Sequence, residues 1–344
     1  MTKSLNINKN FFKNKTLFIS GGTGTFGKNF LKTIVNNKIG VKKLIIFSRD
    51  ELKQSELKKQ YPVSKYKFLR YFIGDVRDAE RLDIALKGVD IVFHAAALKQ
   101  VDTAEYNPTE CIKTNISGSE NIIYSSIKNG VKKVVALSTD KACSPINLYG
   151  TTKLAAEKLF VSANVYHSNQ TLFSVLRYGN VSASRGSVIP LFLNHLKEGN
   201  NYFPITDKRM TRFWIDIDQA VKMAMDLSKN MIGGEILIPE IPSFRVVDLA
   251  RAINKKIKLK FIGIRPGEKI HEEMVGSHES IRTFKGTNYF YILPEFLMGK
   301  NKIIKKLKLK KLKIGFNYSS EKNDFLNQKQ LEKKIVKLKN DTIF

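Results

Sequence analysis

Cysteine is scarce in this sequence of 344 residues, which contains only Cys111 and Cys143. Two cysteines are too few for a disulfide framework or for a zinc site built from thiolates. The five histidines show no short His-to-His spacing of the kind that metal ligands use, so we expect no metal site. Cys143 lies among reactive side chains, yet we expect it to be a packing or loop residue rather than a reactive thiol.

Long apolar runs are also absent. No stretch approaches the ~20 apolar residues that a membrane-spanning helix needs. Residues 1–15 lack the continuous apolar core of a signal peptide. We therefore expect a cytoplasmic protein without a membrane span.

Acidic residues are few, because 31 Asp and Glu stand against 59 Lys and Arg, and the net charge is +28. Such a charge suits a protein that binds nucleic acid, an anionic membrane or a phosphorylated substrate. The lysines are spread along the chain, and the densest run, 300–313, contains no aromatic residues of the kind found in RNA-binding modules. We therefore predict a solvated basic surface and no nucleic-acid partner.

A glycine-rich segment, 21–27, follows a short apolar strand expected at 16–20 and precedes a helix expected at 28–36. It satisfies the pattern Gly-x-Gly-x-x-Gly, whose glycines allow a tight turn and a close approach of the backbone to a pyrophosphate. The N–H groups at the start of the helix favour the phosphates. The residues of this turn that we expect at a dinucleotide cofactor are Gly21, Thr23, Gly24, Thr25, Phe26 and Gly27.

The second strand, expected at 43–47, ends in Ser48, Arg49 and Asp50, which we expect to contact the cofactor ribose. An acid at this point holds the 2′-hydroxyl of NAD, whereas an arginine suits the 2′-phosphate of NADP. Arg49 therefore favours NADP, and a ribose held by Asp50 is the alternative.

Further strands are expected at 71–75, 90–94, 133–137 and 173–177, with helices at 109–129 and 149–165 between the later ones. This alternation predicts an α/β fold, a Rossmann-like doubly wound parallel sheet whose ligands bind beyond the strand ends. The remaining residues that we expect at the cofactor are Asp75, Val76, Ala95, Ala96, Ala97, Lys99 and Asn115.

The segment 138–153 concentrates reactive side chains after the fifth expected strand. It contains Thr139, Asp140 and Lys141, followed by Tyr149 and Lys153 one helical turn apart. A hydroxyl, an acid, an amine and a phenol within sixteen residues indicate an enzyme.

From residue 178 onward the strand–helix alternation ends. We predict a cofactor domain at 1–180, to which 213–240 returns, and a smaller C-terminal α/β substrate-binding lobe at 181–212 and 241–344. Arg185, Arg212 and Arg265 lie on separate loops of this lobe. They can converge on a diphosphate through bidentate contacts or pair with surface acids, and the pattern does not choose between the two.

The sequence resembles the extended short-chain dehydrogenase/reductase family, and within it the inverting UDP-N-acetylglucosamine 4,6-dehydratases of bacterial sugar biosynthesis. The resemblance rests on stretches between residues 15 and 275, among them G-G-T-G-T-F-G (21–27), S-T-D-K-A (138–142), L-Y-G-T-T-K-L (148–154), T-D-K-R-M-T-R-F-W (206–214) and R-P-G-E-K (265–269). Retaining dehydratases of this family carry Asp-Glu in place of Asp140-Lys141, and capsule-type relatives often carry methionine in place of Tyr149. Leu98-Lys99-Gln100 is closer to the capsule type.

The resemblance implies a lyase that uses bound NADP to oxidise C4 of UDP-N-acetylglucosamine, removes water across C5–C6 and returns the hydride to C6. Tyr149, with its pKa lowered by Lys153 and the nicotinamide charge, takes the C4 hydroxyl proton, and Thr139 hydrogen-bonds the same oxygen. Lys141, neutral because its pKa is depressed, is the base at C5, and Asp140, with a raised pKa, is the acid at the C6 hydroxyl. The substrate contacts that the resemblance implies are Lys99, Tyr178, Asn180, Arg185, Ser187, Val188, Thr206, Met210, Arg212, Arg265 and Glu268.

The implied product is UDP-2-acetamido-2,6-dideoxy-β-L-arabino-hex-4-ulose, inverted at C5, on the way to pseudaminic acid. The family also implies a homo-oligomer, a dimer or a hexamer. Two alternatives remain open at this point: a UDP-sugar epimerase or capsule-type enzyme of the same fold, and a non-catalytic basic protein that binds nucleic acid or membrane through 300–313.

Overall fold

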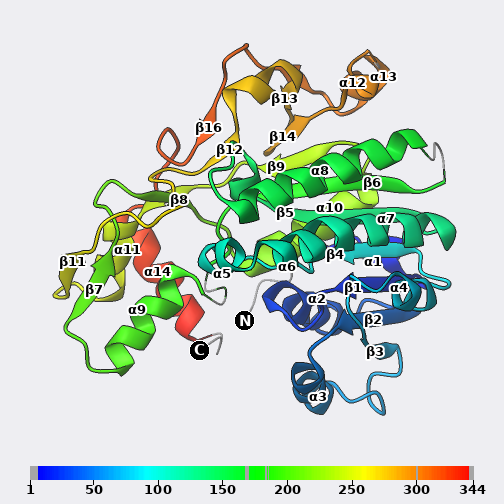
Figure 1. Ribbon diagram of the computed structural model, residues 1–344, viewed down its shortest axis with the longest axis horizontal. Coiled ribbons are helices and arrows are strands. Elements are labelled where there is room, and N and C mark those ends of the chain that lie inside the picture. Colours follow the sequence, from blue (N-terminus) through cyan, green and yellow to red (C-terminus); the bar gives the residue numbers. More distant parts are fainter. Residues whose placement is uncertain (1–6, 167–169, 183, 185, 300, 341–344) are drawn as a thin grey trace.

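The computed structural model describes residues 7–166, 170–182, 184, 186–299 and 301–340 (Figure 1). Its centre is a set of parallel strands that pair side by side: β1 (Thr16–Ser20), β2 (Lys43–Ser48), β3 (Leu69–Ile73), β4 (Ile91–His94), β5 (Lys133–Thr139), β6 (Leu172–Tyr178) and β9 (Ile236–Pro239). Their order, β9-β6-β5-β4-β1-β2-β3, reverses direction between β1 and β4. The predicted Rossmann-like α/β fold is therefore confirmed.

Three antiparallel strands extend this sheet beyond β9. They are β14 (Tyr289–Ile292), β13 (Thr283–Lys285) and β15 (Lys310–Lys311), which complete a ten-stranded sheet in the described part of the chain. All three lie in the range 241–344 that the sequence assigned to the smaller lobe, so the sheet runs further along the chain than expected.

Helices cover both faces of the sheet (Figure 1). On one face α2 (Thr25–Asn36) packs against α10 (Ile217–Asn230), and on the other α7 (Gly118–Lys128) packs against α4 (Ala79–Ala85) and α8 (Leu148–Tyr166). Because both faces are covered, strands such as β1 are buried at every residue, and this is why they read as continuous apolar runs. The helix α3 (Glu51–Gln60) follows β2, and α1 (Lys9–Phe12) precedes β1.

The long helix expected at 109–129 is divided into three parts. It consists of α6 (Pro108–Ile112), a π-helical turn at Lys113–Ser117, and α7, with α5 (Val101–Tyr106) before it. Single π-helical turns inside α-helices are frequent at functional sites. This turn contains Asn115, one of the residues expected at the cofactor.

A second, smaller unit packs beyond the carboxyl ends of the parallel strands. Its elements are α9 (Val188–Lys197), β7 (Tyr202–Ile205), β8 (Thr211–Phe213), β10 (Ser243–Arg245), α11 (Val246–Ile253), β11 (Lys258–Phe261) and α14 (Gln328–Asn340). It has its own apolar core, in which Phe192 stacks on Phe203 with ring centroids 4.4 Å apart and Trp214 is fully buried. The final helix therefore returns to the unit that begins near residue 188.

The segment between the sheet edge and α14 contains the densest lysine run. α12 (Glu295–Met298) and α13 (Asn301–Lys306) precede β15, and Leu309 is buried in a small apolar cluster with Phe284 and Leu297. The lysines between 302 and 313 are exposed. The chain then reaches β16 (Tyr318–Ser319), which pairs with β12 (Glu273–Val275) next to the 3₁₀ turn Ser277–Arg282. Among the described helices, none is both long and apolar enough to cross a membrane.

Candidate active site

A cavity of about 1020 Å³ lies at the carboxyl ends of the parallel strands and extends to the second unit. Its walls run from the glycine-rich turn at one end to residues 262–272 at the other. This is the edge at which doubly wound sheets bind their ligands. The described side chains that the sequence placed at a cofactor or substrate line this cavity, except for Gly27 and Asn115. Arg185 lies outside the described residues.

The glycine-rich turn has the geometry that its spacing predicts. Gly21 has a φ of 65°, and a Cβ there would lie 2.9 Å from the backbone nitrogen of Ala96. A Cβ on Gly27 would lie 2.3 Å from the carbonyl oxygen of Gly22, so Gly27 serves the packing of α2 rather than the cavity wall. No side chain caps α2 at Gly24, which leaves the N–H groups of its first turn for a ligand in the cavity.

Side chains at the ends of β2 and β3 surround the next part of the cavity. Ser48 and Thr23 join their hydroxyls at 2.7 Å, and an Arg49 guanidinium nitrogen lies 3.7 Å from an Asp75 carboxylate oxygen. Asp50 caps α3 by accepting from the backbone N–H of Lys53 at 2.9 Å. Burial alone would raise the pKa of Asp75, but hydrogen bonds from Arg77 lower it below its usual range. Arg49 is the exposed cation of this group.

Asn115 lies behind the cavity wall and fixes the loop that follows β4. Its side chain accepts from the Leu98 N–H at 2.8 Å and donates to the Leu98 carbonyl at 2.9 Å and to the Thr152 hydroxyl at 3.0 Å. In the structure Asn115 clamps Leu98, and its expected contact with the cofactor stays a prediction. The loop is held at its start by Ser20, whose hydroxyl accepts from the N–H groups of Ala95 and Ala96.

The reactive side chains of 138–153 come together at the centre of the cavity. Thr139 ends β5, Asp140 and Lys141 form a 3₁₀ turn (Asp140–Ala142), and Tyr149 and Lys153 lie on the first turns of α8. Thr139 hydrogen-bonds to Tyr149 and donates to an Asp140 oxygen at 2.9 Å. Lys153 donates to the Leu137 carbonyl at 2.7 Å. The sequence therefore identified a set of neighbours in space.

The ionisation of Tyr149 and Lys153 follows from burial. Burial raises the pKa of Tyr149 to about 12, although the charge of Lys141 and the hydrogen bond with Thr139 act in the opposite direction. Burial also lowers the pKa of Lys153 to about 8. For the protein groups alone, the loss of hydration outweighs the nearby positive charge. The expected lowering of the pKa of Tyr149 also depends on the nicotinamide charge and stays a prediction.

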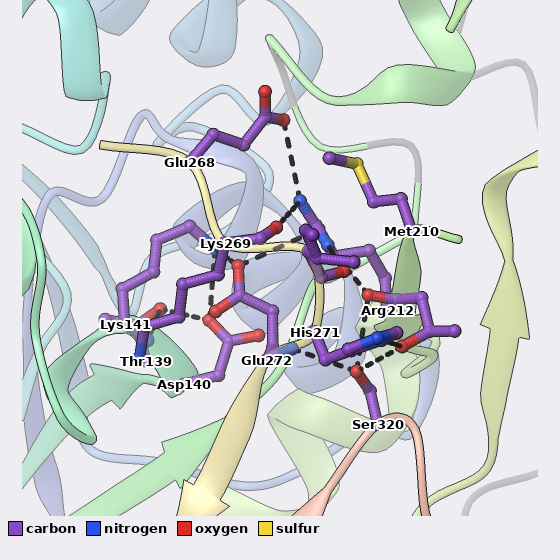
Figure 2. Close-up of polar contacts among 12 residues, drawn as sticks. Thr139, Asp140, Lys141, Met210, Arg212, Glu268, Lys269, His271, Glu272 and Ser320 are labelled. Atoms are coloured by element: carbon purple, nitrogen blue, oxygen red, sulfur yellow. Dashed lines mark hydrogen bonds and ion pairs between the residues drawn. The ribbon is translucent and has the colours of Figure 1, made fainter. Parts of the chain in front are cut away.

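Lys141 has two carboxylate partners (Figure 2). Its amine nitrogen lies 3.2 Å from Asp140 Oδ1 and 2.9 Å from Glu272 Oε1. Burial alone would lower the pKa of Lys141, but the charges of Asp140 and Glu272 raise it above its ordinary value. The expected depressed pKa of Lys141 is therefore wrong. Burial raises the pKa of Asp140, as expected of an acid, with the charge of Glu272 adding to the effect.

Glu272 is the side chain of this centre that the sequence analysis missed. It is 1% exposed and precedes β12 at the end of a loop that also contributes Arg265 and Glu268. Burial would raise the pKa of Glu272, but Lys141 and Arg212 lower it. A glutamate at the end of this loop gives no sequence signal of burial, because glutamate is usually exposed.

Two of the three expected arginines meet at one acid. Arg265 donates to Glu268 at 3.1 and 3.2 Å, and an Arg212 nitrogen lies 3.5 Å from the same carboxylate. Arg212 is also held by the carbonyls of Thr211, Lys269 and Ile270. The pair forms one wall of the cavity, with Arg212 buried and Arg265 half-exposed.

Buried polar atoms without a protein partner gather in the cavity wall. Of the described side chains, those that line the cavity and have such an atom are Thr114, Ser138, Asp140, Asn180, Ser187 and Glu272. Thr206 hydrogen-bonds to the Met210 sulfur at 3.2 Å, Tyr178 is buried beside Tyr149, and Val188 begins α9. Since buried polar atoms require hydrogen-bond partners, the wall is suited to a polar ligand.

None of the described cysteines and histidines lines the cavity. Cys111 and Cys143 are buried, and burial raises the pKa of the Cys143 thiol far above its ordinary value. Among the described residues, no group of three or more His, Cys, Asp or Glu side chains is arranged to hold a metal ion.

Comparisons with known proteins agree with this architecture. A UDP-N-acetylglucosamine 4,6-dehydratase (inverting) of Campylobacter jejuni is 50% identical over 337 residues, which cover 96% of this chain and 99% of that protein. A UDP-glucose 4-epimerase of Rickettsia canadensis is 43% identical over 288 residues, covering 82% and 83%. The X-ray structure of Pen from Bacillus thuringiensis matches with a TM-score of 0.86 at 38% identity and covers 95% of this chain and 99% of that one.

A family model described as polysaccharide biosynthesis protein matches residues 17–294. The matched range includes the glycine-rich turn, the segment 138–153 and the loop that ends in Glu272. Since the model matches most of the chain and the C. jejuni relative matches nearly its whole length, the chain belongs to the polysaccharide biosynthesis protein family.

Proposed function

We propose that this protein is an inverting UDP-N-acetylglucosamine 4,6-dehydratase, a hydro-lyase that uses NADP. The observation that carries the proposal is the buried pair Asp140–Lys141 beside Thr139 and Tyr149, in a cavity that also contains a dinucleotide-binding turn. The C. jejuni relative, which bears this name, supports the reaction. An epimerase needs the phenol and Lys153 but has no elimination step for an acid–amine pair to perform.

The residues present fit a nicotinamide dinucleotide. The uncapped start of α2 and the close approach at Gly21 suit a pyrophosphate, and the exposed Arg49 suits a 2′-phosphate. Asp50 is engaged as the cap of α3, which favours Arg49 as the ribose-side contact and therefore NADP over NAD. When bound, this cofactor accepts a hydride from C4 of the sugar and gives it back at C6.

The first half-reaction needs a base at the C4 hydroxyl. Tyr149 is the candidate because its phenol is hydrogen-bonded to Thr139 and lies on the same helix face as Lys153. Burial raises the pKa of Tyr149 and so disfavours its phenolate. The phenol can act as a base only where nearby positive charge stabilises that phenolate. Thr139 then hydrogen-bonds the C4 oxygen while the C4 hydroxyl is oxidised to a ketone.

The second half-reaction removes the C5 proton and the C6 hydroxyl. The C4 ketone acidifies the C5 proton, and Lys141 is the candidate base. Burial raises the pKa of Asp140 and so favours its protonated form, which makes it the candidate acid that releases the C6 hydroxyl as water. The C4 hydroxyl proton that Tyr149 has taken is the candidate proton for C5, and its delivery to the opposite face inverts that centre.

The uridine diphosphate part of the substrate needs cations and polar contacts away from the sugar. Arg212 and Arg265 stand together at Glu268 and form a positive wall for the diphosphate. Asn180 and Ser187 have buried polar atoms available for hydrogen bonds from the ligand. Arg185, Thr206, Met210, Lys99, Tyr178 and Val188 complete the proposed set of substrate contacts.

Mass spectrometry of UDP-N-acetylglucosamine incubated with the purified protein tests the proposal. Loss of one water supports a dehydratase, and NMR of the product reports whether C5 is inverted. A nucleotide sugar of unchanged mass with an altered C4 configuration would instead establish an epimerase, the activity named for the Rickettsia relative. Salt-sensitive retention on DNA or anionic vesicles that survives Tyr149→Phe, without any turnover, would favour a basic binding protein.

We also propose that the enzyme works in the cytoplasm as a homo-oligomer, a dimer or a hexamer, and that its product leads to pseudaminic acid. Exposed aromatic side chains support the oligomer, because Tyr106 is 88% exposed at the end of α5 and Tyr124 is 61% exposed on α7. Sedimentation of the purified protein decides this part, and a monomer at high concentration would contradict it.

A further inference from the structure

We propose that Glu272 is the proton partner of Lys141: it accepts a proton from the lysine before C5 is deprotonated and returns it after the elimination. This proposal rests on the proposed dehydratase function. Glu272 is a positioning residue in this scheme, because it acts through Lys141 rather than on the sugar.

The geometry places the two groups in direct contact within a buried site. Figure 2 shows Glu272 and Lys141 in contact, with Glu272 Oε1 2.9 Å from the Lys141 amine nitrogen. The Glu272 side chain is 2% exposed. Its second oxygen, Oε2, is buried without a hydrogen-bond partner among the described residues. One oxygen is therefore committed to the lysine, and the carboxylate still has capacity for a proton.

Glu272 is held in place by its backbone. Its N–H donates to the Ser320 hydroxyl at 2.9 Å, and its carbonyl accepts from the Ser320 N–H at 2.8 Å. Ser320 is bonded in turn to the Thr211 hydroxyl at 2.7 Å, next to Arg212 on β8. The approach of Glu272 to Lys141 is thus fixed by three separate segments of the chain.

The charges around Lys141 explain why it needs a proton acceptor. Asp140 shares its turn, Tyr149 faces it from α8, and Lys99 faces it from the loop after β4. Arg212 from β8 and Glu272 complete the charged groups close to Lys141, and the charge of Lys269 also acts on Glu272. In this surrounding the pKa of Lys141 is raised, so the resting lysine is an ammonium and cannot serve as a base.

A single proton transfer from Lys141 to Glu272 converts the ammonium into an amine that can act as a base. The N–H bond of Lys141 that points to Glu272 breaks, and an O–H bond forms on Glu272, which turns two charged groups into two neutral ones. No electrons are gained or lost. The neutral amine then takes the C5 proton, the electron pair of the C5–H bond forms the C5–C6 double bond, and the C6 hydroxyl leaves as water with the proton of Asp140.

The same contacts account for the recovery of the acid. After elimination, Lys141 is an ammonium again, Glu272 is protonated and Asp140 is an anion. The lysine nitrogen lies between the two carboxylates, at 3.2 Å from Asp140 and 2.9 Å from Glu272. Lys141 can therefore pass one proton to Asp140 and take one from Glu272, which restores the starting state of all three groups.

The test compares Glu272→Gln, which cannot accept the proton, with Glu272→Asp, which can. Glu273→Gln is the matched control, because it makes the same substitution one residue away. The Glu273 carboxylate accepts a hydrogen bond from Asn317 at 2.7 Å rather than from Lys141. The measurements are kcat and KM for UDP-N-acetylglucosamine over a range of pH, with thermal unfolding and NADP binding as checks of folding. Fluorescence of enzyme-bound reduced nicotinamide in a single turnover reports C4 oxidation separately.

For Glu272→Gln we expect kcat to fall by about 100-fold, the size of a general acid–base contribution. The acidic limb of its kcat–pH profile should move to higher pH, because Lys141 then has to lose its proton to solvent. Reduced nicotinamide should accumulate, since C4 oxidation is spared. Glu272→Asp should recover the wild-type limb, and Glu273→Gln should match wild type.

Unchanged kcat in Glu272→Gln would overturn the proposal, and so would a fall in kcat with an unchanged pH profile, which would indicate a purely structural role. These outcomes require a wild-type enzyme that dehydrates UDP-N-acetylglucosamine. A wild-type protein that releases no water from this sugar would instead refute the proposed function itself.

Discussion

Lys141 and Glu272 show which residues of the site can be identified from the sequence and which cannot. Thr139, Asp140 and Lys141 could be identified because they stand together in one short segment at the end of a strand. Glu272 could not, because its importance comes from a contact with Lys141 across 131 positions of the chain. The ionisation of Lys141 was mispredicted for the same reason, since the expected low pKa left out the second carboxylate.

Replacing Lys141 by methionine tests its proposed role as the C5 base. We expect Lys141→Met to lower the rate of water loss by about 100-fold or more, because methionine cannot accept a proton. Binding of NADP and of UDP, measured by calorimetry, should stay at the wild-type level. Lys158→Met, which changes an exposed lysine of α8, is the control. Full activity in Lys141→Met would remove this lysine from the base role.

Replacing Arg49 by alanine tests the preference for NADP. A hydrogen bond to a charged group contributes about 1.5–3 kcal/mol, so we expect the affinity for NADP to fall by about 10-fold or more. The affinity for NAD, which has no 2′-phosphate, should change little. Both constants are measured by titration of the same variant, and an equal loss for the two cofactors would contradict the assignment.

At the scale of single elements, the parallel strands were predictable and the interruptions of helices were not. Buried strands such as β1 and β5 read as apolar runs between turn signals, and the structure places both where expected. The π-helical turn 113–117 leaves no such mark, because it arises where Asn115 clamps Leu98 and Thr152. The antiparallel strands β13–β15 are short, and their partners are set by tertiary packing.

The junction between the 3₁₀ turn 140–142 and α8 depends on Gly150. A Cβ at this position would lie 2.2 Å from the carbonyl oxygen of Lys141, so a methyl group forces the two segments apart. We expect Gly150→Ala to destabilise the protein by about 1–3 kcal/mol and to reduce kcat as well, since Lys141 and Tyr149 are displaced from each other.

Thermal unfolding and turnover of the two alanine variants Gly150→Ala and Gly299→Ala check this expectation. Gly299 has open space around its Cβ position, so Gly299→Ala should behave as wild type. A Gly150→Ala protein with wild-type stability and kcat would show that the junction tolerates the methyl group.

At the scale of the whole molecule, a buried ion cluster ties the parallel sheet to the later part of the chain. Arg177 on β6 is fully buried and bonds Glu157 on α8 at 2.6 Å and Glu279 at 2.8 Å. Burial would raise the pKa of Glu279, but Arg177 lowers it to about 2 from an ordinary value of 4.5. No sequence pattern indicated this cluster, because arginine and glutamate are both usually exposed.

This cluster predicts a pH dependence of stability. Because the pKa of Glu279 is lower in the folded than in the unfolded protein, its contribution is complete above pH 4.5 and disappears as the pH falls towards 2. The shift corresponds to about 3 kcal/mol of the free energy of unfolding. Urea unfolding of wild type through this range should show that loss.

The matching variant is Glu279→Gln, with Glu80→Gln on the exposed side of α4 as control. We expect Glu279→Gln to cost about 3–5 kcal/mol at neutral pH, because it leaves Arg177 buried with one partner fewer. Its stability should also depend less on pH between 4.5 and 2 than that of wild type. An equal pH dependence in the two proteins would assign the effect to other carboxylates.

The bonds between Ser320 and Glu272 have a consequence for the order in which the protein is made. A chain emerging from the ribosome folds its earlier segments first. The glycine-rich turn, the phenol and Lys141 are all synthesised before residue 320. Glu272 gains its fixed position only when β16 and Ser320 arrive, beside β12. The proposed proton transfer between Lys141 and Glu272 therefore depends on a segment that is synthesised after the rest of the site.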